Sequence, residues 1–94
     1  MMITLEVLTR DSSFNKGLVR DVFSTTPMSI NTNSIISISP SRQNIHEVNG
    51  KSTSDLSFTE VVYSMGSSVE RVTVVGEYSK LVKSMTNTRR LLSD

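Results

Sequence analysis

Residues 56–85, which read LSFTEVVYSMGSSVERVTVVGEYSKLVKSM, constrain the fold of this chain more than any other segment. Two runs rich in β-branched and aromatic residues, 56–65 and 69–75, predict two adjacent strands. The Gly-Ser-Ser sequence between them predicts a tight turn. Apolar residues occur on both faces of both strands, which is typical of strands in the middle of a sheet or in a small barrel.

An amphipathic helix is predicted directly after this hairpin, because Gly76 interrupts the strand pattern. Tyr78, Leu81, Val82 and Met85 recur with helical spacing, and two lysines lie on the opposite side. The pattern leaves open whether the helix continues through residues 89–92 or stops near 86–88. The side chains predicted as core are Val61, Val72, Val74, Leu81, Val82 and Met85.

The N-terminal third is more broken and more polar. Alternating apolar residues predict a strand over 2–9, followed by a turn at 10–13. Around Gly17 the pattern is ambiguous, and we favour a turn at 15–17 followed by a second strand. Pro27 is expected to interrupt the strand pattern. A further strand is then predicted in which the alternate residues from 30 to 38 share one face, with Pro40 ending that strand or marking an edge.

Residues 41–55 form the most polar stretch of the sequence. Asn49-Gly50 is a strong signal for a type I′ turn, since both residues tolerate positive φ. Ile45 and Val48 before it, and residues 51–53 after it, predict a small projecting hairpin. A mobile loop is the alternative.

Together these elements predict one domain of the mainly β (α+β) class. Four or five antiparallel strands form a small twisted sheet or barrel, and a C-terminal helix packs across it. Residues 86–94 are expected to be either a flexible basic tail or an extension of that helix. With 94 residues, no cysteine and few aromatics, the core is small. A small core and free sheet edges predict a homo-oligomer.

Charge is unevenly distributed along the chain. Residues 1–79 carry eight acids and six basic residues, whereas residues 80–94 carry four basic residues and one acid. A basic C-terminal segment favours two interpretations: a solvated helix face whose cations suit the helix C-terminus, or a contact with nucleic acid or a membrane.

Residues that commonly carry catalysis are scarce. The absence of cysteine excludes a disulfide framework and a thiolate zinc site. His46 is the only histidine, and no nucleophile elbow, phosphate-binding loop or dinucleotide-binding motif is present. Glu60 and Arg71 are expected to form an ordinary cross-strand pair. We therefore expect no enzyme activity, no cofactor and no metal.

The first residues of the chain, MMITLEVLTRD, have no basic segment followed by a continuous apolar run. This pattern does not predict a secretory signal, and no run reaches the length of a membrane span. We expect a cytoplasmic protein without a membrane contact.

The order of these features resembles that of the small FlbD/SwrD-type proteins linked to flagellar and swarming motility. The residues that carry the resemblance are Ile3, Leu5, Ile30, Asn31, Ile35, Ile38, Thr59, Val61, Tyr63, Val72, Val74, Leu81 and Val82. This chain departs from that pattern in lacking Asn-Gly at the first turn and in carrying extra residues at 14–28. The resemblance implies an architecture and no function.

We expect the chain to be a non-enzymatic, self-associating binding or regulatory module. Its composition is also similar to that of small phage-encoded proteins that modulate a host partner. The alternative is a binder of nucleic acid or a small nucleotide, using basic residues at a subunit seam or in the C-terminal segment. The candidate binding residues are Arg42, His46, Asn49, Lys51, Arg71, Lys80, Lys83, Arg89 and Arg90.

Overall fold

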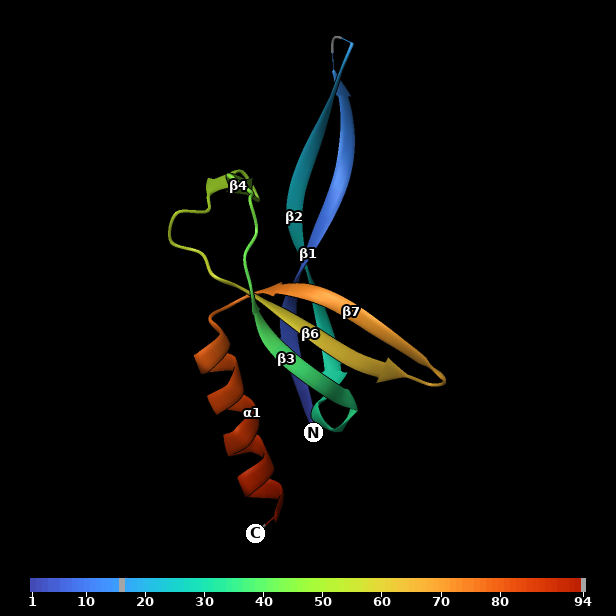
Figure 1. The fold of residues 1–94 in the computed structure, drawn as a ribbon, viewed down its shortest axis with the longest axis vertical. Coiled ribbons are helices and arrows are strands. Elements are labelled where there is room, and N and C mark those ends of the chain that lie inside the picture. Colours follow the sequence, from blue (N-terminus) through green and yellow to red (C-terminus); the bar gives the residue numbers. More distant parts are fainter. Residues whose placement is uncertain (16, 94) are drawn as a thin grey trace.

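The computed structural model describes the backbone of residues 1–15 and 17–93, and the side chains of residues 1–12 and 17–85. The described residues form two antiparallel sheets, one α-helix and one short 3-10 helix, arranged as in Figure 1. The elements are β1 (Met2–Asn15), β2 (Leu18–Asn31), the 3-10 helix η1 (Thr32–Ser34), β3 (Ile35–Ser41), β4 (Glu47–Val48), β5 (Lys51–Ser52), β6 (Phe58–Met65), β7 (Ser68–Val75) and α1 (Tyr78–Ser93). The main sheet has the order β2-β1-β7-β6-β3, and β4 pairs with β5.

The predicted fold class is confirmed in its sheet form, since the main sheet is open and has β2 and β3 as its edges. The central hairpin is also confirmed. β6 and β7 pair along their whole lengths, and the Met65↔Ser68 pair closes a two-residue turn. Gly66 begins that turn with φ +62, a conformation that favours glycine.

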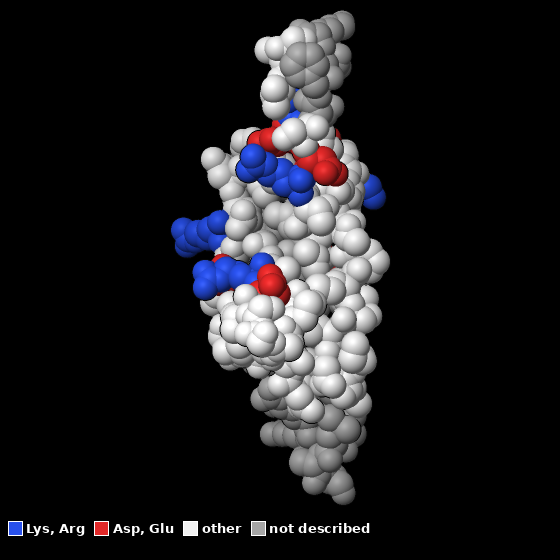
Figure 2. Space-filling model, turned by 90° about the vertical axis from the view of Figure 1, so that its right-hand side faces the viewer, with Lys and Arg blue, Asp and Glu red and all other residues white. Residues whose placement is uncertain are grey.

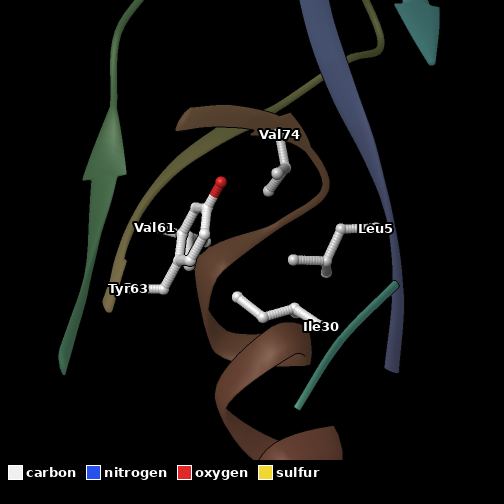
Figure 3. Close-up of a cluster of buried hydrophobic side chains, with 5 residues drawn as sticks. All are labelled: Leu5, Ile30, Val61, Tyr63 and Val74. Carbon is white, nitrogen blue, oxygen red and sulfur yellow. The ribbon is translucent and has the colours of Figure 1, made fainter. Parts of the chain in front are cut away.

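The core lies between this hairpin and the first half of β1–β2. Leu5, Ile30, Val61, Tyr63 and Val74 point toward one another there (Figure 3). Among the six predicted core residues, Val61, Val74 and Met85 are buried and the other three are half-buried. The sequence predicted a half-buried strand over 2–9, but the six predicted core residues include none from β1 or β2. Their contribution follows from the pairing of Val7 with Val74, which places β1 beside β7 of the central hairpin.

Two predictions for the N-terminal third are wrong. No turn interrupts β1 at 10–13: the strand continues to Asn15, because each of these residues pairs with a residue of β2. Pro27 does not interrupt β2 but lies within it, opposite Glu6. β2 is an edge strand, where the missing N–H of proline is tolerated. The turn predicted at 15–17 is confirmed by the Asn15↔Leu18 pair and by Gly17 at φ +80.

Residues 30–38 do not form one strand, which corrects a third prediction. The chain turns a corner at η1, where the Asn31 side chain accepts a hydrogen bond from the Asn33 N–H at 3.0 Å. The Thr32 N–H donates to the Met1 carbonyl at 3.0 Å, and Thr32 is buried. Local hydrogen bonds of asparagine compete with the strand ladder and explain the corner. Pro40 lies in the edge strand β3, as one of its two predicted roles required.

The predicted hairpin around Asn49-Gly50 is confirmed, with φ +54 and +76 at its two turn residues. It does not project freely, because Val48 is buried and the Asn49 N–H donates to the Phe23 carbonyl at 3.0 Å. The segment therefore covers the outer edge of β2 near residues 23–25.

α1 begins at Tyr78 and continues to Ser93, so the helix extension, rather than the tail, describes residues 86–93. The Leu81 N–H donates to the Glu77 carbonyl at 3.1 Å in the first turn. Met85 is buried, whereas Leu81 and Val82 are half-buried. Lys80 and Lys83 are exposed, as the amphipathic pattern predicts.

The molecule is elongated, with extents of 58 × 32 × 18 Å and a radius of gyration of 15.3 Å. A compact domain of this length has a radius of gyration of about 12 Å. The β1–β2 hairpin causes the difference, because its far half rises away from the other strands (Figure 1). We call residues 2–9 and 24–31 the proximal half, and residues 10–15 and 18–23 the distal arm.

Candidate functional site

A groove lies where β3 ends, β6 begins and α1 starts. Its volume is about 510 Å³, within the range of small-molecule sites. It is lined by Pro40, Ser41, Arg42, Gln43, Thr53, Leu56, Ser57, Phe58, Glu77 and Tyr78. The groove thus brings one candidate binding residue, Arg42, together with Phe58 and Tyr78. The sequence pattern assigned these two aromatic residues to the sheet and to the helix.

The residue types that line this groove suit a planar or anionic ligand. Phe58 is buried beneath it, and Tyr78 is 38% exposed at its rim. Arg42 is exposed, and no acidic residue of the described part of the chain forms an ion pair with it. Glu77 is already engaged, because Ser79 Oγ donates to its Oε1 at 2.6 Å. A guanidinium beside aromatic rings can stack on a flat ligand and pair with an anion.

The three other candidates from the polar segment 41–55 lie outside this groove. His46 is exposed immediately before β4, and Lys51 is exposed as the first residue of β5. Asn49 has a structural role, since its Oδ1 accepts from the Thr25 N–H at 3.0 Å and its Nδ2 donates to Thr25 Oγ1 at 2.9 Å. These bonds use the polar atoms that a ligand would need.

The remaining basic candidates are dispersed. Arg71 lies 3.7 Å from Glu60, which is the predicted cross-strand pair, and Lys80 lies 4.0 Å from Glu77. Lys83 is exposed on α1, and the side chains of Arg89 and Arg90 lie outside the described residues. On the face in Figure 2, most basic side chains lie next to acidic ones rather than in one continuous basic patch.

The distal arm is a second surface, and sequence reasoning missed it. Leu18, Val19 and Val22 are 73%, 71% and 47% exposed. Leu18 and Val22 lie on one face of the hairpin and Val19 lies on the other, because facing alternates along a strand. In the sequence, residues 18–23 match a strand pattern as well as the other predicted strands do. The pattern does not show whether a third strand pairs beside them.

No cluster of three or more His, Asp or Glu residues in the described part of the chain could hold a metal ion. Among the described residues, no helix is both long enough and apolar enough to cross a membrane.

Comparisons with known proteins gave no match: no family model, no curated protein and no solved structure is similar to this chain. The resemblance to FlbD/SwrD-type proteins stays a prediction.

Proposed function

We propose that this chain is a non-enzymatic binding module that self-associates through the distal arm. The observation that carries the proposal is the exposure of Leu18, Val19 and Val22 on a hairpin to which no third strand is added in the described structure. An isolated two-stranded hairpin is marginally stable in water. A partner that covers the arm would bury these apolar side chains, which the described part of the chain leaves exposed.

The energetics favour such a contact. Covering apolar surface contributes about 25 cal/mol for each Å² removed from water. The described side chains of the arm include two cations and two anions, of which Arg10 and Asp21 already pair at 3.5 Å. The partner therefore meets exposed apolar side chains among charged ones, and the described charges balance.

Sedimentation velocity over a range of protein concentrations tests this proposal. We expect a dimer for the natural chain and a monomer for the Leu18→Ser/Val22→Ser variant, because serine removes the apolar contact. Ile36→Ser is the matched control, since Ile36 is 57% exposed but lies on β3, away from the arm. Circular dichroism checks that all three fold. A natural chain that stays monomeric, or a control that dissociates equally, would overturn the proposal.

The groove favours a second candidate function, the binding of a small nucleotide. Arg42 and Tyr78 line one hollow and offer an anion contact and a stacking surface. Purified protein would then release ultraviolet-absorbing material when heated, or bind a labelled nucleotide in equilibrium dialysis. Arg42→Ala should reduce that binding at least tenfold, whereas Arg71→Ala should leave it unchanged, since Arg71 lies outside the groove. Equal effects of the two variants would reject the groove.

A further inference from the structure

We infer that a pocket between the main sheet and the β4–β5 hairpin binds a free amino acid with an aliphatic side chain. The pocket has a volume of about 260 Å³. Among its described lining residues, only Leu56 also lines the groove at Arg42. The pocket lies apart from the exposed residues of the distal arm, so its ligand does not depend on the proposed self-association.

The sheet side of the pocket is the face opposite the core. Leu5 and Val7 face the core, so Glu6 between them faces the other side of the sheet. Val7 pairs with Val74, whose side chain is fully buried in the core. The next residue of β7, Val75, therefore lies beside Glu6 on the outer face, and both residues line the pocket.

The β4–β5 hairpin forms the opposite wall and is held to the sheet by two side-chain hydrogen bonds. Asn49 Oδ1 accepts from the Thr25 N–H at 3.0 Å, and Asn49 Nδ2 donates to Thr25 Oγ1 at 2.9 Å. Val48, the residue before Asn49, is buried. These contacts fix the hairpin, and with it Lys51, before a ligand arrives, which lowers the ordering cost of binding.

The apolar part of the pocket suits a branched aliphatic chain. Val48, Leu56 and Val75 supply aliphatic side chains, and the described lining residues include no aromatic ring. A dry cavity of about 150 Å³ in a protein core takes up benzene. The larger volume here therefore has room for a branched chain of four carbons together with a polar head group.

Charge complementarity specifies the head group. Glu6 and Lys51 are both exposed at the pocket, and among the described residues neither forms an ion pair, with the other or with a third residue. An ammonium group of the ligand complements Glu6, and a carboxylate complements Lys51. A ligand with a single charge would leave one of the two side chains unmatched. The aliphatic lining and the two opposite charges together describe an aliphatic amino acid.

Methyl NMR with three probes of similar shape tests this site. The probes are L-leucine, isocaproate, which lacks the ammonium group, and isoamylamine, which lacks the carboxylate. We expect leucine to shift the methyl signals of Val48, Leu56 and Val75 in a saturable way, and to bind about fivefold more tightly than either analogue. The methyl signals of Val69 should not move, since Val69 is exposed on β7 outside the pocket.

Charge variants show which side chain binds which end of the ligand. Glu6→Gln should weaken leucine binding about fivefold without weakening isocaproate binding, because isocaproate has no ammonium group. Lys51→Gln should weaken leucine binding about fivefold without weakening isoamylamine binding. Glu70→Gln and Lys83→Gln are matched controls that should change neither affinity, since both residues are exposed and lie outside the pocket.

Three results would count against this site. If leucine gives no saturable shift, or if the three probes bind equally, the pocket does not bind an amino acid. If Arg42→Ala weakens leucine binding as much as Lys51→Gln does, the carboxylate lies in the neighbouring groove and Lys51 does not hold it. The Leu18→Ser/Val22→Ser variant should bind leucine like the natural chain, so failure at this pocket leaves self-association through the distal arm untouched.

Discussion

The two halves of the β1–β2 hairpin share one continuous register but have different surroundings. In the proximal half, Leu5 and Ile30 are buried against β6 and β7. In the distal arm, Leu18, Val19 and Val22 remain exposed, and the strands pair only with each other.

This contrast teaches that strand pairing and core formation are separable in this chain. The ladder of β1 and β2 continues for fourteen residues on each strand, although side-chain burial stops about halfway. Cross-strand pairs maintain the arm, whereas burial of apolar surface stabilises the proximal half. The effect of a substitution on folding stability should therefore decrease from the buried proximal half to the exposed distal arm.

The largest difference is expected between two leucines. Leu5→Ala should lower the free energy of unfolding by about 2–5 kcal/mol, because it opens a cavity in the core. Leu18→Ala should change it by less than about 0.5 kcal/mol in the monomer, since Leu18 is exposed. Urea unfolding at low protein concentration measures both. Equal losses would show that the arm is packed.

Asn49 marks the boundary between the halves, because its side chain holds the β4–β5 hairpin to Thr25. Asn49→Ala should lower the free energy of unfolding by about 1–3 kcal/mol, through lost hydrogen bonds and through alanine at positive φ. Asn49→Gly keeps the backbone relaxed and should cost about 1 kcal/mol from the lost bonds. Thermal or urea unfolding compares the two, and equal effects would remove the conformational contribution.

A smaller effect is expected at Thr9, the last residue of the proximal half on β1. Its Oγ1 donates to the Ser24 carbonyl at 3.1 Å in a part-buried position. Thr9→Val keeps the shape of the side chain and should cost about 0.5–1.5 kcal/mol. Thr4→Val is the control, because its hydroxyl bonds Ser29 Oγ at an exposed site where water can replace it. Urea unfolding measures both variants. A larger loss of unfolding free energy for Thr4→Val than for Thr9→Val would contradict this expectation.

The smallest effect is expected for the ion pair of the distal arm. Arg10 and Asp21 lie 3.5 Å apart and both are largely exposed. Arg10→Ala should change the free energy of unfolding by less than about 0.5 kcal/mol, because solvent screens the pair. Unfolding of the natural chain in low and high salt provides the control. A loss above 1 kcal/mol would show that the arm depends on this pair.

Sequence periodicity correctly predicted those elements whose residue pattern is compatible with only one type of secondary structure. The central hairpin, the Asn49-Gly50 turn and α1 were anticipated, because alternation, turn chemistry and helical spacing act locally. The corner at Thr32 and the length of β1 were not. Residues 10–13 carry turn-forming side chains, but they pair with β2, and this long-range pairing overrides local preference.

The candidate site shows the same limit. Arg42 was named from its charge, yet its meeting with Phe58 and Tyr78 depends on where β3 ends relative to α1. Asn49 was named as a binding residue, and its side chain instead holds Thr25, which is distant in sequence. Basic residue type identified exposed side chains without showing which of them share a surface.

By itself, the sequence determined the fold class, the central hairpin, the C-terminal helix and the scarcity of catalytic groups, because each depends on composition or on neighbours along the chain. Only the tertiary structure decided which half of β1–β2 is buried. The reason is geometric: β1 meets β7 at Val7↔Val74 and then diverges from it. The strand pattern is compatible with a partner on either side, and the twist of the sheet decides where that partner ends.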